Sequence, residues 1–259
     1  MGFSADWLAL REPADHAARD GGLLAAAAQV AGPVIVDLGC GTGSTRRAFG
    51  GLAGGAAWRM VDADEGLLRL AGGEGFCLDL NDVEALPLDG AGLVTASALF
   101  DLVSAEWVER FVARVAGLRL PVYAALSYDG VMAWEPALPE DAAVTTAFNR
   151  HQGGDKGFGP ALGPKAADHL AARLRAAGYA VREADSPWRL GPDQAALQAE
   201  LLGGIAQAAG EAGFAGADAW LAARRAMLEQ GECRIGHRDL LALPPGVVAG
   251  VKEAEDADG

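Results

Sequence analysis

Residues 34–44 of this chain read Val-Ile-Val-Asp-Leu-Gly-Cys-Gly-Thr-Gly-Ser. The apolar and β-branched start is typical of a buried parallel strand, and the alternating glycines predict a tight turn directly after it. Glycine adopts positive φ angles without strain and lets the backbone come close to a ligand. We therefore expect Gly39, Gly41 and Gly43 to form the loop of a nucleotide-type pocket.

The spacing of these glycines indicates which nucleotide the loop binds. A dinucleotide loop has the spacing G-x-G-x-x-G and sets a pyrophosphate at a helix N-terminus. Here the spacing is G-x-G-x-G, and Asp37 stands just before it. An unpaired carboxylate at this place repels phosphate and suits a ligand that carries ammonium and sulfonium charge. The run resembles the first motif of the class I S-adenosylmethionine-dependent methyltransferases.

Two further acids follow predicted strands. Residues 58–62 form a short strand that ends at Asp62, at about the distance from the first glycine expected of an acid that binds ribose hydroxyls. Asp64 is interpreted as the N-cap of the next helix. The third strand spans residues 76–81, and the resemblance implies that Asp79 meets the adenine amino group there. Alternatively, Asp79 only forms a turn.

The resemblance implies a set of cofactor-binding residues along the strand ends, with Ser97 beside the methionine part of the cofactor. We expect a helix that begins near Pro13, and Arg11 and Arg19 would share one of its faces if it includes both. Each either binds the cofactor carboxylate or forms solvated ion pairs with neighbouring acids. The full predicted set is Asp37, Gly39, Cys40, Gly41, Gly43, Asp62, Ala63, Asp79, Leu80, Ser97, Arg11 and Arg19.

Strand and helix patterns alternate along the rest of the chain and predict one doubly wound, Rossmann-like α/β domain over residues 1–259. The sheet should have seven, mostly parallel strands, and the resemblance implies that the seventh is antiparallel between strands five and six. The later predicted strands are residues 93–97, 121–127, 179–184 and 234–243, and the helices are 104–116, 164–177, 193–208 and 217–229.

Residues 130–163 form an unusually long connection after strand five, and we interpret them as a lid over the substrate. The predicted acceptor-binding residues are Tyr128, Asp129, Trp134, Asn149 and Gln152. His151 is a candidate general base, with Asp101 after strand four as a second candidate catalytic residue. The Asn/Asp-Pro-Pro-aromatic signature of methyltransferases that modify planar amides is absent after strand four, so the acceptor atom stays open.

The charge balance bears on partners and location. The chain has 259 residues with 21 basic and 35 acidic side chains, a net charge of −14, and it has no basic block. Nucleic-acid binding draws on neutralised phosphates, so a nucleic-acid substrate is disfavoured. We expect no metal, no membrane partner and a cytoplasmic location, with residues 252–259 as an acidic tail.

The sequence therefore predicts methyl transfer from S-adenosylmethionine to a small-molecule acceptor, with S-adenosylhomocysteine as the product. Two alternatives stay open at this point. The chain could bind the cofactor without turnover, as a regulatory protein. The chain could also be a nicotinamide-dependent oxidoreductase, an alternative that the glycine spacing fits less well.

Overall fold

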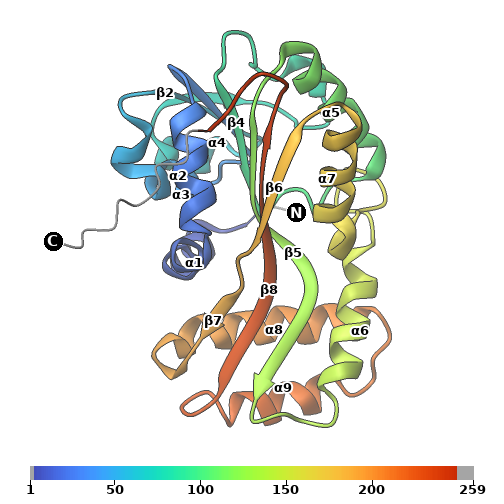
Figure 1. The fold of residues 1–259 in the computed structure, drawn as a ribbon. Helices are drawn as coiled ribbons and strands as arrows, with labels where there is room; N and C mark the ends of the chain where they lie inside the picture. The colour runs from blue at the N-terminus through green and yellow to red at the C-terminus, as the bar shows by residue number, and fades with distance from the viewer. Residues whose placement is uncertain (1–2, 250–259) are drawn as a thin grey trace, which may run out of the picture.

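The computed structural model describes residues 3–249, and the predicted tail at 252–259 lies outside them. One sheet runs through the molecule in the order β3-β2-β1-β4-β5-β8-β6, with β7 paired to β8 (Figure 1). The strands are β1 (Val34–Leu38), β2 (Ala57–Asp62), β3 (Glu74–Cys77), β4 (Leu93–Ser97), β5 (Val122–Glu135), β6 (Ala180–Asp185), β7 (Trp188–Leu190) and β8 (Glu232–Leu243).

The strand order confirms the doubly wound, Rossmann-like prediction. Strand β1 pairs in parallel with both β2 and β4, so the order reverses between β1 and β4. Strand β8 is antiparallel to its neighbours β5 and β6. The sheet has eight strands instead of seven, because the short β7 adds to the edge of β8. In such sheets ligands bind at the carboxyl ends of the strands where the order reverses.

Helices cover both faces of the sheet. They are α1 (Ala5–Ala18), α2 (Gly21–Val30), α3 (Ser44–Phe49), α4 (Glu65–Ala71), α5 (Ala105–Leu118), α6 (Asp141–Gln152), α7 (Ala166–Ala176), α8 (Ala195–Glu211) and α9 (Ala217–Arg225). Ser104 caps α5 by accepting a hydrogen bond from the Trp107 amide, and Trp107 and Phe111 lie on the buried face of that helix. No helix within residues 3–249 is long and apolar enough to cross a membrane.

The predicted start of α1 and the predicted end of β5 are wrong. Helix α1 does not begin near Pro13 but at Ala5, because the Ser4 side chain caps it by accepting from the Trp7 amide. Strand β5 does not end near residue 127 but continues to Glu135, where it pairs with the start of β8. Residues 130–135 therefore belong to the sheet and not to a lid.

The C-terminal part of β5 and the N-terminal part of β8 pair with each other and extend the sheet toward α6, α8 and α9, in the lower half of Figure 1. We call this part of the molecule the second packing unit. Its core is a separate cluster of buried apolar side chains. Trp134 on β5 meets Trp220 on α9 there, edge to face, with ring centroids 5.3 Å apart. Strand β7 links this unit to α1, which lies over the carboxyl ends of the central strands.

Candidate functional site

A cavity of about 640 Å³ opens at the carboxyl ends of β1, β2 and β4, beneath α1. Most of the predicted cofactor-binding residues line it. These are Arg11, Gly39, Cys40, Gly41, Asp62, Ala63, Asp79, Leu80 and Ser97. Three predicted members, Asp37, Gly43 and Arg19, do not line the cavity and lie behind its wall.

The glycine loop has the backbone that its sequence predicts. Gly39, Gly41 and Gly43 have φ angles of +61°, +52° and +84°. A Cβ on Gly43 would lie 2.4 Å from the carbonyl oxygen of Ala71 at the end of α4, whereas one on Gly41 would meet only the end of the Leu8 side chain, at 3.0 Å. Gly43 therefore serves close packing behind the pocket, while Gly41 borders the cavity.

Asp62 connects the ends of two neighbouring strands. Its Oδ2 accepts a hydrogen bond from the Gly41 amide at 2.9 Å, and its Oδ1 accepts one from the Asp64 amide at 3.0 Å. Asp64 is the N-cap of α4, as predicted, since its Oδ1 accepts from the amides of Gly66 and Leu67. Each Asp62 oxygen keeps a lone pair, and Asp62 lines the cavity.

Asp79 makes the turn that one alternative predicted, and its contact with adenine stays a prediction. Its Oδ1 accepts from the amide and side chain of Asn81, at 2.9 and 3.1 Å, so it does form a turn. It also lines the cavity next to Leu80. The Leu80 carbonyl accepts from the Trp107 indole at 2.7 Å, which fixes this wall to α5. Strand β3 ends earlier than predicted, at Cys77.

Two buried charged side chains lie behind the cavity. Asp37 is 1% exposed, and its Oδ1 accepts from the Thr95 hydroxyl at 2.8 Å while its Oδ2 has no partner in residues 3–249. Burial raises the pKa of Asp37 to about 7. Arg19 is 7% exposed and donates to the Ser97 hydroxyl at 2.9 Å. Arg19 thus orients a cavity-lining side chain without lining the cavity itself.

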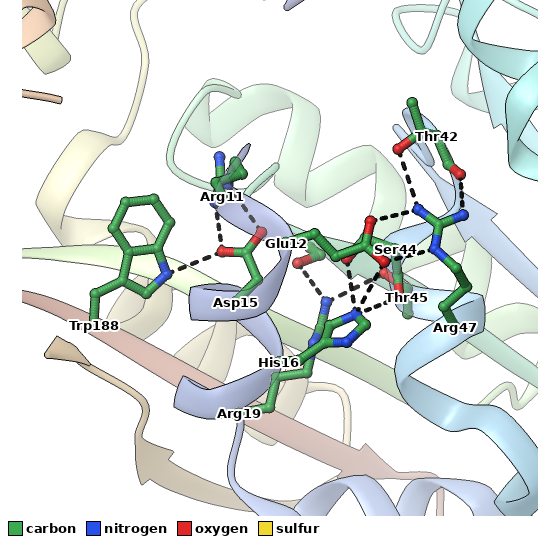
Figure 2. A network of polar contacts seen from close by, with 11 residues as sticks. Arg11, Glu12, Asp15, His16, Arg19, Thr42, Ser44, Thr45, Arg47 and Trp188 are labelled. Carbon is green, nitrogen blue, oxygen red and sulfur yellow. Dashed lines mark hydrogen bonds and ion pairs between the residues drawn. The ribbon is translucent and has the colours of Figure 1, made fainter. Parts of the chain in front are cut away.

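Helix α1 is fastened over the glycine loop by polar contacts that the sequence did not reveal (Figure 2). Arg47 on α3 donates to both oxygens of Glu12, at 2.6 and 2.5 Å, and to the Thr42 carbonyl. His16 contacts Ser44 at 3.1 Å. The hydrogen bond to Arg47 holds the pKa of Glu12 below its ordinary value. We name these contacts, made by Glu12, His16, Thr42, Ser44 and Arg47, the α1 clasp.

Arg11 connects the cavity to the second packing unit. It forms a bidentate ion pair with Asp15, at 2.9 and 3.1 Å, and stacks over the Trp188 ring at 4.9 Å. The Trp188 indole donates to Asp15 at 3.0 Å. Of the two alternatives for Arg11, the ion pair with a neighbouring acid is therefore formed, although the pair is buried instead of solvated.

The end of the cavity beyond β4 is mostly apolar. Ala98, Leu99, Leu102 and Phe158 line it together with Leu8 from α1. Phe158 belongs to the segment 153–162, which follows α6, and it packs edge to face against Trp107 at 6.3 Å. Sequence reasoning placed Phe158 in the lid but not in the site. Only this late part of the predicted lid reaches the cavity.

None of the five predicted acceptor-binding residues lines the cavity. Trp134 is 6% exposed in the core of the second unit, because β5 continues past its predicted end. Tyr128 donates to Asn149 at 2.7 Å, and Asn149 in turn donates to the Gly130 carbonyl. Asp129 closes a turn by accepting from the Val131 amide. Gln152 is the last residue of α6.

The two candidate catalytic residues differ in environment. His151 contacts Glu211 through Nε2 at 2.9 Å and Lys156 through Nδ1 at 3.2 Å, and it does not line the cavity. Asp101 does not line the cavity either, although the next residue, Leu102, does; its buried Oδ1 has no hydrogen-bond partner among the described residues. Burial raises the pKa of Asp101 to about 6. No group of metal-ligating side chains occurs within residues 3–249.

No protein-family model matches the chain, and no curated protein matches it. Among solved structures, a cyclopropane synthase from Mycobacterium tuberculosis aligns with 93% of this chain and 94% of its own, with a TM-score of 0.51 and 12% identity. A cyclopropane-fatty-acyl-phospholipid synthase-like protein from Lactobacillus casei aligns with 92% and 94%, with a TM-score of 0.49 and 16% identity.

A third solved structure is human N-acetylserotonin methyltransferase, bound to S-adenosylmethionine. It aligns with 67% of this chain at 15% identity and a TM-score of 0.43, and the alignment spans about half of its own length, 48%. At these identities the comparisons show the fold alone, and it is the Rossmann-like fold predicted from residues 34–44.

Proposed function

We propose that this chain transfers a methyl group from S-adenosylmethionine to a small-molecule acceptor. The observation that carries the proposal is the cavity at the ends of β1, β2 and β4, where the glycine loop, Asp62 and Asp79 face one space. In a phosphate-binding site, a helix N-terminus points at the ligand and no carboxylate lies next to it. Here Asp62 is hydrogen-bonded to the loop itself.

The residues around the cavity fit an adenosyl sulfonium. The ribose hydroxyls can donate to the free lone pairs of Asp62, and the adenine amino group can donate to Asp79. Acids outnumber bases among the charged side chains that line the cavity, which are Arg11, Asp15, Asp62, Asp64, Glu65, Arg69 and Asp79. This balance favours a cationic ligand over a phosphate.

The bound cofactor would supply an electrophilic methyl group. The chain's own part is to align the acceptor and to exclude water, because displacement at a sulfonium depends mainly on proximity and orientation. The apolar side chains Leu99, Leu102 and Phe158 serve that exclusion. Asp101 is the candidate for receiving the proton that the acceptor loses, since its pKa of about 6 leaves it ionised at neutral pH.

The small-molecule acceptor and the cytoplasmic location are parts of the same proposal. The acceptor class rests on the acidic charge balance of the chain, which disfavours phosphate-rich partners. The mostly apolar end of the cavity is also better suited to a small molecule than to a polymer.

Calorimetry tests the proposal directly. The chain should bind S-adenosylhomocysteine and should not bind NAD, whereas binding of NAD alone would contradict the proposal. Incubation with methyl-labelled S-adenosylmethionine and an extract of cell metabolites should then transfer the label to a small molecule. Binding of S-adenosylhomocysteine without any labelled product would favour the non-catalytic, regulatory alternative.

A further inference from the structure

One face of the sheet in the second packing unit is open to solvent. Side chains along β5, β7 and β8 alternate between the two faces, and those on the inner face are buried against α6, α8 and α9. The buried ones are Trp134, Leu190, Cys233 and Ile235. On the outer face Arg234 is half-buried, and its neighbours Ala133, Glu135, Arg189 and Glu232 are exposed.

The charges on this outer face are arranged as two like-charge pairs. Arg189 on β7 lies directly opposite Arg234 on β8, and Glu135 on β5 lies directly opposite Glu232 on β8. Glu232 and Arg234 are two residues apart on β8, so the two pairs occupy adjacent rows of the same face. We name these four residues the charged face. Like charges directly opposite each other in a sheet repel, so each pair is unfavourable within a single copy of the chain.

The described chain does not relieve this repulsion. None of the four side chains forms an ion pair within residues 3–249, whereas Arg238, further along β8, pairs with both Glu183 and Asp168. The arginine pair therefore keeps its guanidinium donors, and the glutamate pair keeps its carboxylate acceptors, for partners outside the chain.

The charged face borders apolar surface. Its four residues, together with Ala133, line a hollow of about 320 Å³. A neighbouring hollow of about 480 Å³ shares Ala133 and is lined mostly by apolar side chains, among them Val131, which is 45% exposed. An apolar centre beside a polar rim is typical of protein interfaces.

The two rows are complementary to themselves. In a twofold dimer the same patch of each copy meets the other. An axis that lies between two facing copies, and crosses the line from the arginine pair to the glutamate pair at right angles, brings each arginine pair over the glutamate pair of the other copy. Every contact between opposite charges then forms twice, and the repulsion within each pair is offset.

We propose that the charged face binds the charged face of a second copy of this chain. Arg189 and Arg234 of one copy lie against Glu135 and Glu232 of the partner subunit. The net charge of −14 on each copy opposes association at long range, but salt at about 0.15 M screens charges more than about 8 Å apart and leaves contacting pairs attractive. The proposal does not depend on the proposed function, because none of the four residues lines the cofactor cavity.

The oligomeric state of the full chain tests this proposal. Sedimentation velocity would be measured at about 0.15 M salt and at protein concentrations from about 1 to about 300 µM. The wild type should pass from monomer to dimer over this range, because a small and partly polar interface gives weak association. A wild type that stays monomeric throughout would overturn the proposal.

Charge reversal identifies the face. Arg234→Glu and Glu232→Arg should each weaken dimerisation at least about tenfold, because symmetry makes every substitution place two like-charge contacts in the interface. An equimolar mixture of the two variants should dimerise again, since the contacts between one variant and the other then join opposite charges. Reversals that leave the dimer as strong as in the wild type, or a mixture that stays monomeric, would each show that this face does not bind a second copy.

The chain offers a matched control for these reversals. Arg182→Glu makes the same change at an exposed residue of β6, which pairs with β8 opposite Leu241 and lies outside the charged face. This variant should dimerise as the wild type does. All the variants should keep the circular dichroism spectrum of the wild type, so that a loss of association is separated from a loss of fold. Equal weakening by Arg182→Glu would mean that net charge, and not the charged face, controls association.

Discussion

The amide of Gly41 donates a hydrogen bond to Oδ2 of Asp62 at 2.9 Å, joining the loop after β1 to the end of β2. The two residues belong to separate sequence motifs, and the parallel pairing of β1 with β2 brings the motifs together. The contact fixes the loop and leaves a carboxylate lone pair directed at the cavity. The same side chain thus orders the binding loop and offers a ligand contact.

Replacing Asp62 should therefore affect binding more than stability. Asp62→Ala removes a charge-assisted acceptor, so S-adenosylhomocysteine should bind about tenfold to a hundredfold more weakly. Asp20→Ala is the matched control, because Asp20 caps α2, does not line the cavity and should cost about 1 kcal/mol of stability instead. Calorimetry and denaturant titration of both variants measure the difference. Equal affinity in the two variants would contradict the ribose assignment of Asp62.

Substitution by alanine should destabilise the fold far more at Gly43 than at a surface glycine of similar φ. Gly43→Ala places a Cβ 2.4 Å from the Ala71 carbonyl oxygen, and backbone must shift to admit it. Gly54 has a φ of +65°, and no atom lies within 4 Å of the position that an added Cβ would take, so Gly54→Ala costs only the left-handed strain of about 1–2 kcal/mol. Urea denaturation should show Gly43→Ala as clearly the less stable. If the two variants lose a similar amount of stability, α4 moves away from the added Cβ at little cost.

The cofactor end of the site could be predicted from the sequence because its signals are local. A buried strand, a glycine turn and an acid at the next strand end are each contained in a few consecutive residues, and parallel pairing brings them to one edge. Asp62 and Asp79 were found in this way, and both line the cavity. Neither alternative predicted for Arg19 describes its place in the structure, where it is buried behind the cavity wall and donates to Ser97.

The acceptor end could not be predicted because its contacts are distant in the sequence. Residues 130–135 become a strand only by pairing with β8, which lies near the end of the chain. The role of His151 depends on Glu211 at the end of α8 and on Lys156 across a glycine-rich turn. Single-sequence patterns carry no signal for such pairings.

The stability of the fold should depend on the ionisation of Asp37. Burial raises the pKa of Asp37 from 3.8 to about 7, so the folded chain holds a proton that the unfolded chain releases over this range. This contribution to stability is fully present below pH 3.8 and is lost as the pH rises through about 7. Asp37→Asn, which cannot ionise, should therefore gain melting temperature relative to the wild type between about pH 5 and pH 8. A difference that stays constant over this range would show that Asp37 is ionised throughout.

Breaking the α1 clasp should loosen the roof of the cavity. Arg47→Gln removes both hydrogen bonds to Glu12 and both to Thr42, so α1 should leave its closed position more often. Because Leu8 and Arg11 on α1 line the cavity, S-adenosylhomocysteine should bind roughly twofold to fivefold more weakly, in line with the 0.2–1 kcal/mol typical of partly exposed ion pairs.

Arg173→Gln is the matched control, since Arg173 pairs with Glu109 at 2.6 Å between α7 and α5, and neither residue lines the cavity. It should leave affinity unchanged at a similar cost in stability. Hydrogen exchange should report faster opening of residues 5–18 in Arg47→Gln alone, and unchanged exchange there would mean that Trp188 and Asp15 suffice to hold the helix.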